Sequence, residues 1–533
     1  MRVKCVRFCF FFQIFRCWWN GIHDWFKINC LRLKRSSRLR RIFFLMEFFN
    51  FFDTLFSFNI VIEVIALYIL FSLGYGVLYS SSLELATPPL LNSFLSFSLF
   101  FLILTFIFFG FDISMFSLDY NLYSFNQNIQ LIFLFISIMV LFVTRDFVGA
   151  RFISKFEYDI LFSFVLLSAV CLCFADDFLL IYLAIELQSL CFYVFATFNR
   201  NSEFSTESGL KYFVFGAVIS CLLLVGFSLI YLSFGSTSFE SLLCLTNASD
   251  NPFLFCGIVF ILIAFLFKVG AAPFHSWLCD VYDGAMISVT LLFAAVPKII
   301  IFSVIVKIFL LIFYDFASFW SSFFLFSSLL SIAVGSLSAI YQKRLKRLFA
   351  YSTVAHTGFI LLGVVAASPD SVKTLIFYLM IYSVLTILLF SLLIFAIISI
   401  VRFPGYLASW TSSGLKNYVF VMSFALTLFS IAGIPPLAGF FSKFLILFSF
   451  ISQEYLLTSV TIVLISSVAC FYYIRLIKTF FFVKSSKNSF WISSTKRQHS
   501  EYIIGTLLFF NMFFVFRPEL FSSFSTLISI TLL

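Results

Sequence analysis

Four ionisable side chains lie inside long apolar stretches of this sequence, where a charge is costly. They are Glu186, Lys268, Lys298 and Lys443. A charge at the middle of a lipid bilayer costs about 2.5–3.5 kcal/mol on insertion scales, so such a group pairs with another, loses its charge or lines water. For any one of them the alternative is a structural ion pair, or a lysine that reaches back to the membrane surface. The four together favour a polar path through an apolar protein.

A carboxylate and a lysine placed in this way predict proton transfer. A lysine in a low-dielectric site loses its preference for the charged form, and a nearby carboxylate restores it. Arginine would stay charged in the same place, whereas lysine can give up its proton. We therefore expect Glu186 and Lys268 to act as a switch. The ammonium is stable while the carboxylate faces it, and its proton can pass onward when the carboxylate moves away.

Two apolar stretches are interrupted beside these lysines. The first break lies at 270–273, in FLFKVGAAPFHSW, and the second at 433–440, GIPPLAGF. Proline removes a backbone donor and clashes with the preceding turn of a helix. In lipid, the freed backbone groups must face protein or water. Both breaks are therefore expected to point inward, to a hydrated site.

Two histidines are candidates for relaying protons, because histidine changes its charge near neutral pH. His275 directly follows the first break, where capping the next helix is the alternative role, and His356 lies within an apolar span. Asp280 and Asp283 precede the eighth expected helix, where acidic residues favour a helix start. Lys307 lies nearer the end of a span, and we expect it to be an interfacial anchor.

The composition requires a polytopic membrane protein. Apolar residues make up 62% of the 533 residues and charged residues 11%, against about 45–50% and about 25% in soluble domains. The apolar runs are too long and continuous for a membrane β-barrel. We expect an all-α fold of about 14 transmembrane helices. The expected spans are roughly 54–79, 90–111, 128–145, 158–175, 177–198, 209–234, 252–273, 286–313, 318–340, 345–367, 372–400, 417–450, 455–482 and 503–531.

Neither a metal nor a cofactor is expected on this chain. The twelve cysteines are scattered without a C-x-x-C motif, and the chain has only four histidines. No glycine-rich phosphate loop is present. The chemistry is therefore expected to be carried by side chains alone, and we expect no nucleic-acid partner.

The distribution of basic residues predicts the orientation of the spans. Loops after odd-numbered spans are rich in lysine and arginine, whereas loops after even-numbered spans have almost none, which is the positive-inside bias. The basic segment 1–45 does not follow this bias and is similar in composition to a transit peptide. We interpret it as an extension that lies on the membrane surface or against a partner. A further membrane element at about residues 5–19 is the alternative.

Four segments of the sequence resemble a known family. They are IYLAIELQSLCFYVFATFNRNSEFSTESGLKYFVFGAV, FLFKVGAAPFHSWLCDVYDGAMISVTLLFAAVPKI, KRLKRLFAYSTVAHTGFILLG and AGIPPLAGFFSKF. In this order they are similar to the antiporter-like membrane-arm subunits of the proton-pumping NADH:ubiquinone oxidoreductase, respiratory complex I, of the mitochondrial subunit 2 type. The resemblance covers about residues 155–480, while 1–155 and 485–533 match only in hydropathy.

The resemblance implies two inverted five-helix repeats with helices 7 and 12 broken. It implies helices 1–3 in 46–155, the repeats in 156–315 and 316–484, and a last loop and helix in 485–533. By motif, Glu186 matches the family's glutamate of helix 5. The lysines of helices 7, 8 and 12 are matched by Lys268, Lys298 and Lys443, and His275 and His356 match histidines of the same polar axis. Cys279 and Asp283 depart from the family's P-D-V-Y-E-G, and GAMISVT lacks the family's proline, which affects loop packing rather than the axis.

The resemblance also implies a setting. NAD, FMN, iron–sulfur clusters and ubiquinone would be bound by other subunits of the complex. Other membrane-arm subunits and phospholipids, cardiolipin among them, would be the partners. The 85 phenylalanines are typical of a T-rich organelle genome, so we expect an organelle-encoded protein of the mitochondrial inner membrane. A cation/proton antiporter subunit of the same ancestry and an inactive structural scaffold are the alternatives.

Overall fold

The structure is a computed structural model that describes residues 62–63, 65–74, 76, 118–150, 156–245, 252–399, 406, 418–481 and 499–531. The segment 1–45 and the expected second span, 90–111, lie outside these residues, as does most of the first span. Nine of the described helices are long and apolar enough to cross a membrane, or ten if a bent pair near the C-terminus is one span. The expected all-α membrane fold is confirmed.

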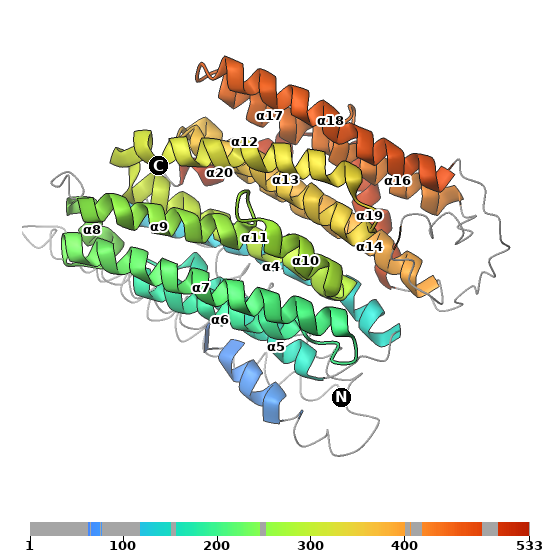
Figure 1. The fold of residues 1–533 in the computed structure, drawn as a ribbon, viewed down its shortest axis with the longest axis horizontal. Helices are drawn as coiled ribbons and strands as arrows, with labels where there is room; N and C mark the ends of the chain where they lie inside the picture. The colour runs from blue at the N-terminus through green and yellow to red at the C-terminus, as the bar shows by residue number, and fades with distance from the viewer. Residues whose placement is uncertain are drawn as a thin grey trace, which may run out of the picture. The chain divides into compact units, whose positions relative to one another are not determined.

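The helices follow the expected spans closely (Figure 1). Their bounds are α4 Leu118–Ala150, α5 Phe156–Cys173, α6 Phe178–Ala196, α7 Glu203–Phe234, α8 Phe239–Leu245, α9 Pro252–Val269, α10 Ser276–Gly284, α11 Ile287–Val306, α12 Ala317–Tyr341, α13 Leu345–Val365, α14 Pro369–Ser399, α16 Tyr418–Ala432, α17 Ala438–Ile451, α18 Leu456–Phe481, α19 His499–Phe513 and α20 Glu519–Ile530.

The same order of helices occurs twice along the chain. The fourth member is broken each time, into α9 and α10 in the first series and into α16 and α17 in the second. A short antiparallel bridge also recurs, between Asp177 and Ser238 in the first series and between Arg344 and Tyr406 in the second. With each broken helix counted as one and the short α8 left out, each series has five members: α5, α6, α7, α9–α10 and α11 in the first, and α12, α13, α14, α16–α17 and α18 in the second. If all five members of the first series cross a membrane, the second series runs through it in the opposite sense.

Both breaks end their first half-helix with the same backbone motif. Gly270 and Gly433 have positive φ angles of 77° and 87°, which glycine adopts without strain. The N–H groups of Gly270 and Ala271 both bond to the carbonyl of Leu266, at 3.1 and 2.9 Å. The N–H groups of Gly433 and Ile434 bond to Phe429 in the same way, both at 3.1 Å. This is a Schellman-type C-terminal cap, and it confirms the two interruptions expected from the sequence.

The centre of the fold is formed by α11, α13 and α14. Every residue of α11 is buried, and most of α13 and α14 is buried as well. In Figure 1, α6 and α7 lie on one side of α11, whereas α17 and α18 lie beyond α13 and α14. Polar groups on α11, α13 and α14 are therefore removed from the outer surface, where lipid would lie.

The expected last span, 503–531, is formed by two helices rather than by one straight helix. Its two parts, Glu501–Phe516 and Glu519–Ile530, meet at an angle of 88°. The bend falls at Arg517 and Pro518, where proline has no N–H to continue the helix. The length of the apolar run predicted a span, but a single proline near its middle decides the shape.

Gly439 provides a test of the second break. A Cβ at this position would overlap the carbonyl oxygen of Ser430 in α16, so the close approach of the two half-helices requires glycine. We expect Gly439→Ala to destabilise the protein by about 1–3 kcal/mol through overpacking. Gly505→Ala in α19 is the matched control, because nothing lies within 4 Å of the added methyl group. Thermal denaturation that affects both variants equally would contradict this account of the break.

Candidate functional site

The first cavity in the described part of the fold holds two of the four predicted lysines. Lys268, from the last turn of α9, and Lys298, from α11, line a cavity of about 30 Å³, measured as space for water centres. Gln188, Ser189 and Tyr212 add polar groups to its wall. A volume of this size holds roughly two water molecules. Lys268 and Lys298 therefore share one space that can be hydrated.

Glu186 lies beside this cavity without touching Lys268. Its charge is close enough to act on that of Lys268, but no ion pair within 4.0 Å joins these two described residues. The Ser189 hydroxyl donates a long hydrogen bond of 3.5 Å to Glu186 Oε2, and Oε1 has no hydrogen-bond partner among the described residues. The structure thus has the carboxylate and the ammonium apart, which is one of the two arrangements that the predicted switch requires.

Lys298 connects the first series of helices to the second. Its side chain is 3% exposed. Its Nζ donates a hydrogen bond of 2.9 Å to the hydroxyl of Tyr382 on α14 and lies 4.8 Å from the centre of that ring. The contact joins residues from opposite halves of the chain. It gives the buried ammonium both a hydrogen bond and an aromatic face.

A second cavity, also of about 30 Å³, holds His356 and Lys443. Tyr382 and Tyr378, both from α14, line it as well. His356 Nδ1 lies 2.6 Å from the Tyr378 hydroxyl, and the rings of His356 and Tyr382 are 5.5 Å apart. Tyr382 therefore faces the second cavity while its hydroxyl binds the lysine of the first.

Lys443 binds the C-terminal end of a half-helix. From α17, its Nζ donates hydrogen bonds to the carbonyls of Ile431, at 3.0 Å, and Ala432, at 2.8 Å. These are the last two residues of α16, where carbonyls without helical partners carry a partial negative charge. Lys268 lies in the last turn of α9 at the other break. Both breaks therefore place an ammonium at a helix C-terminus.

His275 lies apart from the two cavities. It precedes α10, but its side chain makes no capping hydrogen bond, so the alternative role of a helix cap is not supported. Its ring is 6.2 Å from that of Tyr351 on α13, and it lines neither described cavity. Four of the six predicted site residues line a cavity: Lys268 and Lys298 share the first, and His356 and Lys443 share the second. Glu186 lies beside the first cavity, and His275 lines neither.

Comparisons with known proteins identify relatives of this chain. A family model described as NADH:quinone oxidoreductase/Mrp antiporter, transmembrane, matches residues 175–470. The chain is 34% identical to NADH-ubiquinone oxidoreductase chain 2 of Marchantia polymorpha, over 84% of this chain and 93% of the relative. It is 35% identical to NADH-quinone oxidoreductase subunit N of Parvibaculum lavamentivorans, over 66% and 72% of the two chains.

Solved structures share the fold. A chain of respiratory complex I from Thermus thermophilus superposes with a TM-score of 0.69 at 22% identity, covering 86% of this chain and 98% of that one. A chain of the Mrp complex from Dietzia gives a TM-score of 0.74 at 18% identity, with 89% and 97% covered. The chain belongs to the NADH:quinone oxidoreductase/Mrp antiporter membrane family.

Two tyrosines that contact the predicted site residues of this antiporter family member were not expected from the sequence. Tyr378 and Tyr382 are one helical turn apart in a highly apolar helix, so they share a face of α14. Tyrosine is common in packed interiors, and its type alone does not indicate that the hydroxyl binds a lysine or a histidine. The spacing of four residues was the available signal.

Lys307 is a further difference from expectation. It was expected at the membrane surface, but its side chain is only 3% exposed, and it begins a π-helical segment, Lys307–Ile312, after α11. Its Nζ donates a hydrogen bond of 2.5 Å to the carbonyl of Cys173 at the end of α5. Asp176 lies close enough to interact with its charge. The interfacial-anchor interpretation is therefore wrong, because this lysine is buried inside the fold and donates to a backbone carbonyl.

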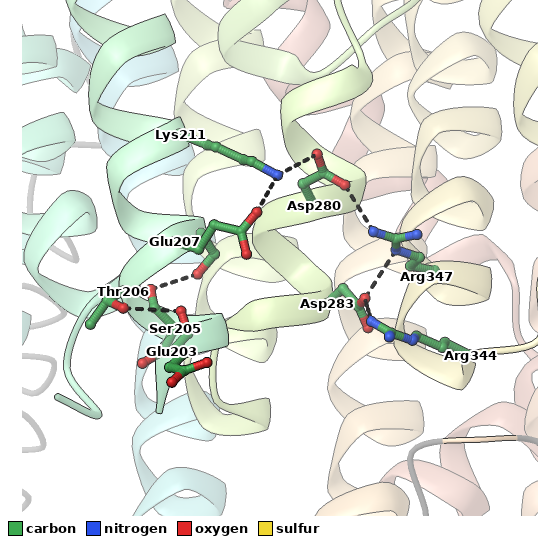
Figure 2. Close-up of polar contacts among 10 residues, drawn as sticks. Glu203, Ser205, Thr206, Glu207, Lys211, Asp280, Asp283, Arg344 and Arg347 are labelled. Carbon is green, nitrogen blue, oxygen red and sulfur yellow. Dashed lines mark hydrogen bonds and ion pairs between the residues drawn. The ribbon is translucent and has the colours of Figure 1, made fainter. Parts of the chain in front are cut away.

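A cluster of six charged residues connects the two series at one end of the helices (Figure 2). Its contacts form a chain from α7 through α10 to α13: Glu207–Lys211 at 2.7 Å, Lys211–Asp280 at 3.5 Å, Asp280–Arg347 at 3.1 Å, Arg347–Asp283 at 3.0 Å and Asp283–Arg344 at 2.5 Å. We call this the charge clamp. It holds α10, the second part of the first broken helix, against α13.

The role expected for the acidic residues of α10 needs correction. Asp280 and Asp283 lie within α10, and they contact basic side chains of α7 and α13 rather than the start of α11. Asp283, with 13% of its side chain exposed, receives two arginines. The hydrogen bond from Arg344 to the Asp283 carboxylate raises the pKa of the Arg344 guanidinium above its ordinary value. This arginine therefore stays charged at any physiological pH. Among the described residues, no group of three or more metal-ligating side chains occurs.

The charge clamp can be tested at Asp283. Asp283→Ala leaves two arginines without their shared acceptor, and we expect it to lower stability by about 1–3 kcal/mol, as for hydrogen bonds to charged groups. The exposed acid Asp315 gives the control Asp315→Ala. The amount of the chain in the assembled membrane complex and its thermal denaturation are the measurements. Equal behaviour of the two variants would show that the clamp contributes nothing.

Proposed function

We propose that this chain is a proton-translocating membrane-arm subunit of respiratory complex I. In this proposal, electron transfer from NADH to ubiquinone takes place on other subunits and drives protons through the Glu186, Lys268, Lys298, His356 and Lys443 path. The hydrogen bond from Lys298 to Tyr382 is the observation that carries the proposal. It is the contact through which the cavity of Lys268 meets the cavity of His356 and Lys443.

The family relationship supports the setting. The curated relatives from Marchantia, Oenothera and Arabidopsis are named NADH-ubiquinone oxidoreductase chain 2. We infer that the chain is an organelle-encoded, multi-pass protein of the mitochondrial inner membrane. Its neighbours would be other membrane-arm subunits and phospholipids, including cardiolipin. NAD, FMN, iron–sulfur clusters and ubiquinone would be bound elsewhere in the complex, so the enzyme would be the assembled translocase.

The internal organisation supports a two-part path. We infer one antiporter-like repeat in 156–315 and a second in 316–484, each with an ammonium beside the broken end of its fourth helix. Proton movement would begin when Glu186 approaches or leaves Lys268, because the carboxylate changes how strongly that site holds a positive charge. Lys298 and Tyr382 would pass the change to the second repeat. His275, outside both cavities, would serve access to the first repeat.

A cation/proton antiporter subunit is the second candidate. The family model spans both classes, and the fold matches a chain of an Mrp complex. The two candidates differ in their partners. Isolation of the chain with flavin- and iron–sulfur-containing subunits favours respiratory complex I, whereas isolation with other antiporter subunits and no redox centre favours the antiporter. A structural scaffold is the third candidate, and the variants below distinguish it.

Lys298→Met removes the central ammonium and keeps most of the side-chain volume. We expect at least about a tenfold loss of NADH-driven proton pumping, because a positioned proton-transfer group typically contributes more than this factor. Lys478→Met, at the exposed end of α18, is the control. Pumping is measured in sealed membrane vesicles together with NADH oxidation and the amount of assembled complex. Normal coupled pumping by assembled Lys298→Met would refute the path and favour the scaffold.

Glu186→Gln keeps the shape of the side chain and removes its charge. Without the carboxylate the charge on Lys268 can no longer be switched, so we expect pumping to fall by a similar factor of about ten or more. Glu203→Gln, at the exposed start of α7, is the control. The number of protons moved per NADH oxidised is the decisive measurement. An unchanged ratio at an unchanged rate would mean that Glu186 is only structural.

A further inference from the structure

A hydrogen bond between Lys298 and Tyr382 joins the walls of the two cavities. Lys298, which lines the first cavity, donates to the Tyr382 hydroxyl at 2.9 Å. Tyr382 itself lines the second cavity with His356 and Lys443. Both partners are almost wholly buried, with 3% of Lys298 and 5% of Tyr382 exposed. The hydroxyl therefore lies between two spaces that can each hold water.

The direction of the hydrogen bond lets the Tyr382 hydroxyl accept from Lys298 and still donate its own hydrogen to another group. A tyrosine hydroxyl has one hydrogen to donate and lone pairs to accept with. An ammonium can only donate, so the Tyr382 oxygen must be the acceptor in its contact with Lys298. The hydrogen of the hydroxyl is then available to a partner on the other side. On that side lies the second cavity, which Tyr382 lines together with His356. The ring centres of Tyr382 and His356 are 5.5 Å apart.

We propose that the Tyr382 hydroxyl is a catalytic group that carries the proton from Lys298 into the cavity of His356 and Lys443, a step that rests on the function proposed above. Lys298 gives one ammonium proton to the Tyr382 oxygen and becomes a neutral amine. In the same step the original hydroxyl proton passes to a water molecule in the second cavity. That water gives its proton to the neutral imidazole of His356 or the neutral amine of Lys443. Tyr382 ends neutral, as it began, and no electron moves.

A purely structural role makes a different prediction. If Tyr382 only holds Lys298 in place, losing the hydroxyl should lower assembly or stability, without making proton movement itself slow. If the hydroxyl carries the proton, its loss leaves a gap between the two cavities. The proton-transfer step then limits turnover. The solvent deuterium isotope effect separates the two cases, because it grows when proton transfer becomes rate-limiting and does not follow the amount of folded protein.

The experiment uses Tyr382→Phe in the assembled complex. The matched control is Tyr473→Phe, which removes the hydroxyl of another fully buried tyrosine that lines neither described cavity. Coupled NADH oxidation and proton pumping are measured in vesicles in H2O and in D2O, per amount of assembled complex. We expect Tyr382→Phe to lower coupled turnover about tenfold or more and to raise the isotope effect, while Tyr473→Phe changes neither.

The outcomes separate this inference from the proposed function. If Lys298→Met stops pumping but Tyr382→Phe pumps as Tyr473→Phe does, the proposed function stands and the relay through Tyr382 is overturned. If Lys298→Met also pumps normally, the proposed function itself fails.

Should Tyr382→Phe not assemble, Tyr382→Met and Tyr382→His are the second pair. Assembled Tyr382→Met with normal turnover would overturn the relay. Turnover lost in Tyr382→Met and restored in Tyr382→His, whose ring can carry a proton, would support it.

Discussion

A charged amine enclosed in an apolar protein is the constraint around which this fold is arranged. Lys298 lies on a helix whose every residue is buried, so its ammonium has no access to the outer surface. An uncompensated charge in such a place is strongly destabilising. The hydrogen bond to the Tyr382 hydroxyl and the nearby face of the Tyr382 ring stabilise this charge. Because Tyr382 belongs to the second series of helices, satisfying one charge also joins the two halves of the molecule.

The two breaks meet a similar need in a different way. A helix that ends inside a membrane protein leaves carbonyls without partners. In the second series Lys443 donates to two of these carbonyls from the other half of the broken helix. In the first series Lys268 lies in the last turn before the break. The helix dipole favours an ammonium near the C-terminal end of each first half-helix, α9 and α16. The same interruption that leaves these carbonyls without helical partners thus provides a place that can hold a positive charge.

Much of this could be predicted from the sequence, for physical reasons. Long apolar runs predicted the helices, and Gly270 and Gly433 with their nearby prolines predicted the breaks, because both signals depend on local chemistry. The rarity of charge in apolar runs directed attention to Lys268 and Lys298, which do share a cavity. Their separation from Lys443 by a tyrosine could not be predicted, because it depends on how α14 packs against α11. The position of Glu186 relative to Lys268 also depends on packing and not on spacing along the chain.

The same limit explains the other differences. Lys307 is close to the end of an apolar run, and only the three-dimensional structure brings the carbonyl of Cys173 to it. The acids of α10 were interpreted by their position before a helix, whereas their partners come from α7 and α13. Basic residues in the loops were used to predict the orientation of the spans by the positive-inside bias. Three of them, Lys211, Arg344 and Arg347, turn out to be bound to acids.

The charges of the charge clamp balance one another. The six members of the charge clamp are three acids and three bases, so together they carry no monopole. The field of such a set decays much faster with distance than that of a single ion, and salt screens what remains. The clamp can therefore fasten α10 to α13 at the end of the helices while leaving the electrical potential along the buried lysines almost unchanged.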